Sequence, residues 1–450
     1  MRIHFISIGG SAMHSLAIAL KEKGHEITGS DDAIFEPSKS KLVKYGLLPE
    51  RIGWNEKNIN EELDAIILGM HAKADNPELI RAQELNLKIY SYPEFLYEQS
   101  KDKTRVVIGG SHGKTTITSM ILHVMNYHEK EIDYMVGAAV NGLENPVHLT
   151  DENDFIVIEG DEYLSSAIDR RPKFHLYHPN IALLSGIAWD HINVFPTYDN
   201  YIEQFKLFIN SIVNGGILVY NEEDPEVKRL AEESENPIRK HPYHTPDYHL
   251  DGDSTILDVP EGELPLEIFG KPNLNNLAGA KWICQHMGID EDDFYEAIAT
   301  FSGASKRLEK IAEAGSSVVF KDFAHSPSKV AASTAAVREQ YPDKKLVACL
   351  ELHTYSSLNS EFLKEYKNSL EPADEALVFY SPDAVAIKNL EAVTIDQIKE
   401  AFNKEGIKVF TTSESFREEL NQLSLKNSVL LMMSSGNYGG VDMEKIKEFI

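Results

Sequence analysis

An α/β fold of several domains is predicted by three features of this sequence. The chain has 450 residues, enough for about three domains at roughly 150 residues each. Short apolar runs alternate with amphipathic stretches from one end to the other, which is the pattern of βαβ units and a mostly parallel sheet. Apolar residues make up 42% and charged residues 26% of the chain, a globular composition that argues against disordered, collagen-like and coiled-coil structures.

The N-terminal part of the chain predicts a first β/α series. A helix is expected over Ser11–Lys23, because apolar positions recur there at helical spacing. Strands are expected at Ile3–Ile8, Glu26–Ser30, Ala65–Leu68 and Lys88–Ser91. The polar segment Glu98–Thr104 follows this series, and we interpret it as a linker.

A second series opens with a strand over Arg105–Gly109, a glycine-rich turn and an apolar helix over Ile117–Met125. The apolar runs Phe155–Ile158 and Ile181–Ile187 predict further strands of the same series. By contrast, the Pro-rich segment HPYHTPDYH, with its three histidines at positions 241, 244 and 249, fits no tight metal motif and is interpreted as a surface loop.

Two helices, near Ala278–Met287 and Asp292–Phe301, precede a third α/β series. The strands of this series are expected at Ser317–Phe320, Leu346–Leu350, Glu375–Tyr380, Lys408–Phe410 and Ser428–Met433. We therefore place domain boundaries near residues 103 and 303.

The charge of the chain limits the partners that it can bind. Lys and Arg number 44 and Asp and Glu 71, so the net charge is 44 − 71 = −27. Such a surface repels nucleic acid and anionic membranes, and we expect neither as a partner. The two cysteines, Cys284 and Cys349, form no CxxC motif and exclude a disulfide framework. No signal peptide or membrane span is recognisable, so a cytoplasmic location is expected.

The sharpest motif is GGSHGKTT, which directly follows the strand Arg105–Gly109 and opens a helix. In this setting backbone N–H groups and the helix dipole favour a bound anion. Lys114 is expected to neutralise the β- and γ-phosphates of a nucleoside triphosphate, and the Thr115 hydroxyl to bind Mg²⁺. The loop is shorter than GxxxxGK[ST], because Ile108 stands five residues before Gly113. The predicted nucleotide-binding residues are Gly110, Ser111, His112, Gly113, Lys114, Thr115 and Thr116.

Two further motifs follow strands of the same series. Glu159-Gly160-Asp161-Glu162 stands at the end of Phe155–Ile158, where open α/β sheets bind ligands. These carboxylates are either a solvated turn or hard oxygen ligands for Mg²⁺, and the preceding phosphate loop favours the second interpretation. Asp190-His191 follows the run Ile181–Ile187. This imidazole either has a structural role or completes the metal site.

The N-terminal turn around Gly9, Gly10 and Ser11 keeps only the central glycine of the GxGxxG fingerprint. Asp31 and Asp32 end the second predicted strand, where a ribose hydroxyl is usually held. These residues indicate a nucleotide pocket without specifying a nicotinamide.

Taken together, these motifs resemble those of the Mur ligases, the ATP-dependent ligases of peptidoglycan synthesis. The family's GTHGKTT is here GSHGKTT, its E-A-D-E is EGDE, and its DH is Asp190-His191. Its adenine-contacting NxxN looks like Asn273 and Asn276, and its DYxHxP looks like the segment from Asp322 to Pro327, which contains His325. The resemblance covers essentially the whole chain, with the motifs in the family's order.

The resemblance implies a Rossmann-like domain over residues 1–103, which binds a UDP-sugar through Gly9, Gly10, Ser11 and Asp31. It implies a central P-loop ATPase-like domain over residues 104–303 and a Rossmann-like domain over residues 304–450, which presents the amine substrate. The residues that it implies for catalysis are Lys114, Glu159, His191 and His325, with Thr115, Glu159 and His191 as ligands of Mg²⁺. It further implies that Asn273, Asn276, Arg307 and Asp322 bind ATP.

Two branches of the family begin with a GIGG-like turn and act on UDP-N-acetylmuramate. One adds L-alanine, and the other adds L-Ala-γ-D-Glu-meso-diaminopimelate during peptidoglycan recycling. MRIHFISIGG, GHEITGSD, DRRPKFHLYHP and LMMSSGNYGG look more like the recycling branch. The L-alanine branch has an arginine-bearing PHRYTRT where this chain has LHTYSSL. The recycling branch has EPRSNTM, and this chain matches it only at Glu351 and at Ser356, which stands for the threonine.

The resemblance therefore implies amide formation between the lactyl carboxylate of UDP-N-acetylmuramate and the tripeptide amine, through an acyl phosphate, with ATP and Mg²⁺. L-alanine as the amine is the alternative. A nucleotide-binding protein that has lost ligase activity and a nicotinamide oxidoreductase are the remaining hypotheses. The family's paired arginine motif RRxE is here Lys306-Arg307-Leu308-Glu309, and Lys306 supplies only a point charge. Lys206, at the spacing of a carbamylated lysine in some relatives, is interpreted as an exposed helix residue.

Overall fold

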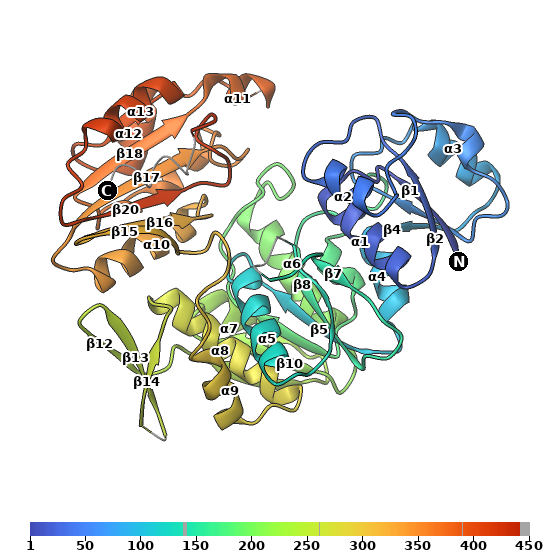
Figure 1. Ribbon diagram of the computed structural model, residues 1–450, viewed down its shortest axis with the longest axis horizontal. Coiled ribbons are helices and arrows are strands. Elements are labelled where there is room, and N and C mark those ends of the chain that lie inside the picture. Colours follow the sequence, from blue (N-terminus) through green and yellow to red (C-terminus); the bar gives the residue numbers. More distant parts are fainter. Residues whose placement is uncertain (138–141, 261, 389, 442–450) are drawn as a thin grey trace. The chain divides into compact units, whose positions relative to one another are not determined.

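The computed structural model describes residues 1–137, 142–260, 262–388 and 390–441 (Figure 1). It divides the chain into two compact units. The first comprises Met1–Gly186, Ile202–Tyr243 and Trp282–Ile289, and the second comprises Ile187–Tyr201, His244–Lys281 and Asp290–Ile450. Each unit contains two kinds of layer, helices and β-sheet, so the predicted α/β class is confirmed.

The first unit begins with a four-stranded parallel sheet in the order β2-β1-β3-β4. Its strands are β1 (Arg2–Ile6), β2 (Glu26–Ser30), β3 (Ala65–Leu68) and β4 (Ile89–Ser91), and its helices are α1 (Ser11–Glu22), α2 (Ser38–Lys44), α3 (Pro77–Glu84) and α4 (Tyr92–Ser100). All four residues of β3 are apolar and buried, as in a parallel strand covered on both faces. Helix α4 begins at a capping box in which Ser91 and Glu94 satisfy each other's backbone N–H groups.

The predicted linker Glu98–Thr104 is wrong over most of its length. Helix α4 continues to Ser100, and β5 (Thr104–Gly109) begins four residues later. The reason is the Arg105 guanidinium, which donates to the carbonyl oxygens of Ser100 (3.1 Å) and Lys101 (2.8 Å). These carbonyls end the helix and have no partner within it, so the arginine stabilises the C-terminus of α4 directly against β5.

The same unit contains a seven-stranded sheet in the order β11-β10-β9-β5-β8-β6-β7. Its other strands are β6 (Asp133–Met135), β7 (Val147–His148), β8 (Phe155–Gly160), β9 (Ile181–Leu184), β10 (Ile217–Asn221) and β11 (Arg239–Tyr243). Only the β6–β7 pair is antiparallel among its described strand pairs. The helices along this stretch of the chain are α5 (Lys114–Tyr127), α6 (Tyr198–Ser211), α7 (Pro225–Glu233), α8 (Lys271–His286) and α9 (Glu291–Ile298). Of these, α9 belongs to the second unit, and the unit boundaries fall within α6 and α8.

The second unit contains a six-stranded sheet in the order β15-β16-β20-β17-β18-β19, in which only β15 is antiparallel to its neighbour. Its strands are β15 (Glu309–Ala314), β16 (Ser317–Asp322), β17 (Lys345–Leu352), β18 (Glu375–Tyr380), β19 (Lys408–Phe410) and β20 (Ser428–Met433). Its helices are α10 (Pro327–Gln340), α11 (Pro382–Ile387), α12 (Ile395–Phe402) and α13 (Ser413–Gln422).

Helices cover both faces of this six-stranded sheet (Figure 1). Successive side chains of a strand point to opposite faces, and the core residues of β17 alternate accordingly. Leu346, Ala348 and Leu350 pack with apolar residues of α10 and α12, whereas Val347 and Cys349 pack with those of α13. The unit is therefore a doubly wound α/β sheet.

A small antiparallel sheet of β12 (Tyr248–Asp251), β13 (Ser254–Val259) and β14 (Gly262–Leu266) also belongs to the second unit. The interpretation of HPYHTPDYH as a loop is therefore wrong for His241, which lies on β11, and for His249, which lies on β12. The first hairpin turns at Gly252, whose φ of +58° favours glycine. Among the described residues, no helix is both long enough and apolar enough to cross a lipid bilayer.

Candidate functional site

The glycine-rich segment Gly110–Gly113 connects the carboxyl end of β5 to the first turn of α5. Gly110 has a φ of +136°, and a Cβ there would stand 2.1 Å from the Ser185 hydroxyl oxygen, so only glycine fits. The Ser111 N–H donates to the Gly186 carbonyl oxygen at 2.9 Å. Gly113 precedes the helix with a φ of +79°. The loop therefore contacts the residues that follow β9, and α5 begins directly after it. This is the arrangement that the sequence predicts for a phosphate loop.

Lys114, the first residue of α5, lies inside this loop. Its Nζ donates to the Gly110 carbonyl oxygen at 2.6 Å and pairs with Glu162 Oε2 at 2.5 Å. The side chain of Lys114 is only 14% exposed and that of Glu162 only 2% exposed. Burial opposes the charge of the ammonium, but the carboxylates of Glu162 and Asp161 outweigh it and raise the pKa of Lys114. The lysine is therefore cationic, and Glu162, to which the motif assigns no individual role, is its partner.

Thr115 and Glu159 place two oxygen atoms side by side at the same edge of the sheet. The Thr115 hydroxyl donates to Glu159 Oε1 at 2.9 Å, and the Gly137 N–H donates to Glu159 Oε2 at 3.0 Å. This juxtaposition arises because β5 and β8 are adjacent and parallel, with Gly109 beside Gly160. Both residues are buried. A hydroxyl and a carboxylate at this spacing fit a Mg²⁺ ion, which prefers hard oxygen ligands.

Asp161 differs from its neighbours in the EGDE motif because it forms an ion pair with Lys173. Burial alone would raise the pKa of the Asp161 carboxyl, but Lys173 and Lys114 lower it well below its usual range. The Asp161 carboxylate is thus ionised and paired with Lys173, whereas the Glu159 carboxylate lies beside the Thr115 hydroxyl.

The predicted UDP-sugar residues meet at the carboxyl ends of β1 and β2. The Gly9 N–H donates to Asp31 Oδ2 at 2.7 Å, and a Cβ on Gly9 would stand 2.9 Å from that oxygen. Gly10 caps α1, and Ser11 is the exposed first residue of that helix. Burial raises the pKa of the Asp31 carboxyl. The structure therefore brings Gly9, Gly10, Ser11 and Asp31 together around one turn.

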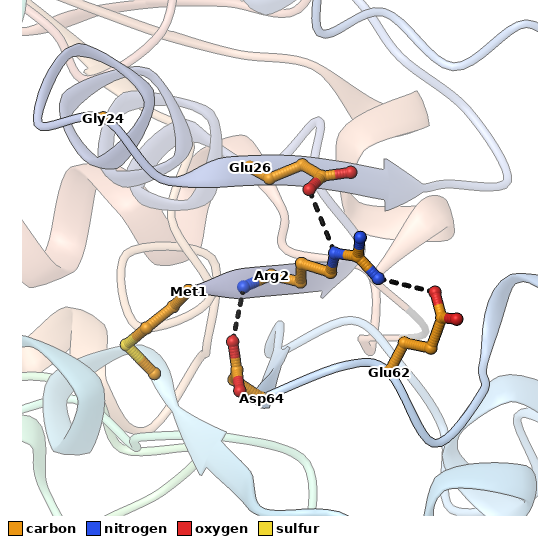
Figure 2. A pocket seen from close by; sticks show the side chains of 6 residues that line it. All are labelled: Met1, Arg2, Gly24, Glu26, Glu62 and Asp64. Carbon is orange, nitrogen blue, oxygen red and sulfur yellow. Dashed lines mark hydrogen bonds and ion pairs between the residues drawn. The ribbon is translucent and has the colours of Figure 1, made fainter.

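A shallow, polar pocket of about 540 Å³ lies at the opposite edge of the same sheet (Figure 2). Arg2 spans it, with its Nε 3.1 Å from Glu26 Oε2 and its Nη1 2.5 Å from Glu62 Oε2. These groups stand at the amino ends of β1 and β2, whereas Gly9 and Asp31 follow the carboxyl ends. The pocket therefore does not coincide with the predicted substrate turn.

The second unit contains a cluster around Asp190, whose side chain is 7% exposed. Asp190 Oδ1 accepts from the His191 N–H at 2.7 Å and from the Ser356 hydroxyl at 3.3 Å. Asp190 Oδ2 lies 3.9 Å from His325 Nε2 and 3.8 Å from Lys329 Nζ. Burial raises the pKa of Asp190, but Lys329 and the two histidines outweigh it and lower the pKa to about 2.

His325 is held in one tautomer. Its Nδ1 lies 2.7 Å from the Phe323 carbonyl oxygen, which can only accept, so Nδ1 carries the proton and Nε2 presents a lone pair. Burial and the nearby Lys329 lower the pKa of His325 to about 4. At neutral pH the imidazole is therefore neutral.

Because His325 is buried in its neutral form, we expect the free energy of unfolding to fall in acid. The pKa of His325 is about 4 in the folded protein and 6.5 in the unfolded chain. The stability that the folded protein gains by keeping this imidazole neutral is therefore fully present above pH 6.5, and it is lost as the pH falls toward 4. It amounts to about 3 kcal/mol in the free energy of unfolding. Urea unfolding of H325N should show a flatter pH profile over this window than the unchanged protein. The same substitution at the more exposed His353 is the control, and an equal slope in H325N and the unchanged protein would contradict the assignment.

The remaining predicted nucleotide residues lie on other elements. Asn273 and Asn276 are on α8, where the Asn273 amide donates to the Phe269 carbonyl oxygen at 2.9 Å. The Arg307 guanidinium lies over the Phe323 ring, with its Cζ 4.7 Å from the ring centroid. The buried Asp322 carboxylate accepts from the Ser333 hydroxyl, and burial raises its pKa. Lys206 is 58% exposed on α6 and pairs at 3.8 Å with Glu203, as interpreted from the sequence.

Two segments of the second unit are joined by Glu351, at the carboxyl end of β17. Its Oε2 accepts from the Ser434 hydroxyl and from the Tyr438 N–H, the latter at 2.9 Å. A Cβ on Gly436 would stand 2.8 Å from the same oxygen. The loop SSGNYGG after β20 therefore folds around the carboxylate that opens the segment Glu351–Leu358.

Of the predicted magnesium ligands, Thr115 and Glu159 lie in the first unit and His191 in the second. The same division separates the phosphate loop from His325. The three-ligand set therefore stays a prediction.

Three family descriptions match successive parts of the chain. "Mur ligase family, catalytic domain" matches residues 2–104, "Mur ligase middle domain" matches residues 108–284, and "Mur ligase, glutamate ligase domain" matches residues 306–436. The chain belongs to the Mur ligase family. Members of this family are ATP-dependent ligases that form amide bonds in peptidoglycan synthesis, and this Mur ligase is accordingly an enzyme of three α/β domains.

Relatives of this Mur ligase include enzymes that are named for two different amine substrates. The UDP-N-acetylmuramate–L-alanine ligase of Caldicellulosiruptor bescii is 29% identical over 90% of this chain and 88% of its own length. The UDP-N-acetylmuramate–L-alanyl-γ-D-glutamyl-meso-2,6-diaminoheptandioate ligase of Escherichia coli is also 29% identical, over 84% of each chain. The crystal structure of a murein peptide ligase from Psychrobacter arcticus aligns with a TM-score of 0.68 and 22% identity, covering 100% of this chain and 98% of that one.

Proposed function

We propose that this Mur ligase joins the lactyl carboxylate of UDP-N-acetylmuramate to the N-terminal amine of L-Ala-γ-D-Glu-meso-diaminopimelate. The observation that carries the ATP-dependent part is the Lys114 ammonium, kept cationic inside the glycine loop at the end of β5. The choice of the tripeptide is supported by four segments that resemble the recycling branch. One of them, SSGNYGG, contacts Glu351, the residue that this branch's EPRSNTM motif shares with this chain.

The chemistry explains the need for these groups. A carboxylate is a poor electrophile, because its negative charge repels the amine and oxide is a very poor leaving group. Phosphorylation by ATP converts it to an acyl phosphate, and attack by the amine then releases phosphate. Phosphoryl transfer depends on positioning and on neutralising charge. Lys114 would neutralise charge on the transferred phosphoryl group, and Gly9, Gly10, Ser11 and Asp31 would hold the UDP-sugar.

Thr115 and Glu159 would hold a Mg²⁺ ion, with His191 as a third proposed ligand. The adjacent oxygens of Thr115 and Glu159 fit this ion, which usually keeps several water ligands and takes few from the protein. When bound, the ion supplies positive charge at the phosphate oxygens. Because ATP and UDP-sugars are cytoplasmic, we place the reaction in the cytoplasm.

L-alanine is the second candidate amine. It is favoured by the Caldicellulosiruptor bescii relative, which is named for that substrate and aligns over 90% of this chain. The arginine-bearing segment of the L-alanine branch, however, is replaced here by Leu352–Leu358, in which no arginine occurs.

Phosphate release from Mg-ATP and UDP-N-acetylmuramate, with either amine offered, tests the proposal. We expect turnover with the tripeptide and little with L-alanine. Turnover with L-alanine alone would overturn the choice of amine but keep the ligase. If Mg-ATP binds and neither amine yields phosphate, the ligase proposal itself fails.

A further inference from the structure

Two residues that follow β9, Ser185 and Gly186, hold the main chain of the phosphate loop. The Gly186 carbonyl oxygen accepts from the Ser111 N–H at 2.9 Å and from the Ser111 hydroxyl at 3.2 Å. The Ser185 hydroxyl donates to the carbonyl oxygen of His112 and, at 3.3 Å, to that of Gly109. All of these residues belong to the first unit. The loop therefore depends on the segment after β9 for its shape.

The backbone of Gly186 does not itself require glycine. Its φ lies outside the left-handed region, unlike that of Gly110. A Cβ on Gly186, however, would overlap the Cε1 and Nε2 atoms of the His112 imidazole. The need for glycine at this position therefore comes from a side chain of the phosphate loop, whose ring lies directly against the Gly186 backbone.

Asp224, which follows β10, is a second neighbour of this imidazole. Its Oδ1 accepts from the N–H groups of Glu226 and Val227, both at 3.0 Å, and so caps α7. Its Oδ2 lies 3.3 Å from the point at which a Cβ of Gly186 would stand, and the His112 ring occupies that same point. One carboxylate oxygen thus caps a helix, and the other lies near the imidazole.

The order of the strands explains why these groups meet. In the seven-stranded sheet β10, β9 and β5 are consecutive and parallel, so that their carboxyl ends lie side by side. Gly186 comes from the segment after β9, Asp224 from the segment after β10, and His112 from the loop after β5. The sequence motifs assign a role to His112 but none to the other two residues.

We infer that Gly186 and Asp224 position the His112 imidazole and thereby set the shape of the phosphate loop that binds ATP. Gly186 supplies the space for the ring, and the Asp224 carboxylate supplies a negatively charged hydrogen-bond acceptor near it. Both are positioning residues, because they act on ATP through His112. The inference rests on the phosphate site of the proposed function and extends that site to the ends of two further strands.

The first experiment uses G186A. Alanine suits the backbone of residue 186, and its methyl group needs only the free end of the His112 side chain to move. G186A should therefore keep its stability in urea unfolding and weaken Mg-ATP binding on the order of tenfold, measured by titration calorimetry. Its affinity for UDP-N-acetylmuramate should stay within about twofold. H112A should weaken Mg-ATP binding by a similar factor, and the double variant H112A/G186A should be no weaker than H112A, because the space is then already empty.

The second experiment uses D224N, which keeps the oxygen that caps α7 and removes the charge near the imidazole. D224N should also weaken Mg-ATP binding, and it should have no further effect in H112A. This comparison adds no methyl group and so stands apart from any effect of G186A on folding. D151N, at a side chain that is 80% exposed, is the control for loss of an acidic residue on the same unit.

A purely structural role for these residues gives a different pattern. In that case the variants would lose stability and would bind Mg-ATP and the UDP-sugar equally poorly, and this result would overturn the inference. Unchanged Mg-ATP affinity in G186A and D224N would overturn it as well, as would effects that multiply in the double variants. If the unchanged enzyme does not bind Mg-ATP, the phosphate site of the proposed function fails and this inference with it.

Discussion

Replacement of Lys114 by methionine should lower turnover at least about a thousandfold, because the cation at the transferring phosphoryl group is lost. The variant should also be less stable. Glu162, which is 2% exposed, would be left charged without its partner at 2.5 Å, and breaking a buried pair in this way costs about 3–5 kcal/mol. The double variant K114M/E162Q should recover the stability but not the activity. Phosphate release and urea unfolding measure the two effects separately.

The chain offers a matched control for this experiment. Lys103 Nζ pairs with Asp133 Oδ2 at 2.7 Å, and their side chains are 8% and 0% exposed. K103M removes a similarly buried lysine of the same unit that has no proposed role in catalysis. It should lose comparable stability and keep its turnover at a temperature where it remains folded. Full activity of K114M would show that the phosphate site has been assigned to the wrong residues.

Replacement of Arg105 by methionine should cause a large loss of stability. Its guanidinium donates six hydrogen bonds to five backbone carbonyl oxygens, those of Ser100, Lys101, Lys103, Tyr177 and His178. Each buried carbonyl left without a partner costs about 1–3 kcal/mol. Even with water reaching some of them, we expect a loss of more than about 4 kcal/mol, measured by urea or thermal unfolding.

The contrast with Arg2 makes this prediction specific. Arg2 forms ion pairs at 3.1 Å and 2.5 Å, but its side chain is 49% exposed and those of its partners are 68% and 74% exposed. Exposed ion pairs contribute little to stability because solvent screens them, so R2M should be nearly neutral. R105K should not rescue, because one ammonium cannot reach carbonyls that a planar fork of five N–H groups reaches. Equal stability of R105M and R2M would contradict the argument.

Much of the fold was predictable because the inner strands of its parallel sheets are short, apolar and largely buried, as in β3, β18 and β20. The predicted strands Glu26–Ser30, Ala65–Leu68, Glu375–Tyr380, Lys408–Phe410 and Ser428–Met433 coincide with β2, β3, β18, β19 and β20. The sequence interpretation did not include the hairpin β12–β13, although its two turn residues, Gly252-Asp253, are a typical hairpin dipeptide. The prolines just before this dipeptide favour a loop, which hides the signal of the turn.

Other features had no local signal. The Glu98–Thr104 segment is polar, but nothing in it shows that the Arg105 side chain links the carbonyls at the end of α4 to those of residues 177 and 178. The pairing of Lys114 with Glu162 was also unassigned, since EGDE contains three carboxylates and nothing in the motif says which one faces the lysine.

The sequence by itself determined the elements and the glycine loop, because alternation of apolar residues and the steric freedom of glycine act over a few neighbouring positions. The same local patterns place Gly110 and Glu159 at the ends of strands, and Lys114 and Thr115 in the first turn of the helix that follows β5. Only the tertiary structure decided which of those ends are neighbours. The strand order β16-β20-β17 puts the segments after Asp322, Met433 and Leu352 at one edge of a sheet. It thereby joins Glu351 to the SSGNYGG loop, and packing of the same unit joins Ser356 to Asp190, 166 residues away in the chain. Such contacts arise from the pairing of parallel strands whose connections are long, and the local sequence contains no record of that pairing.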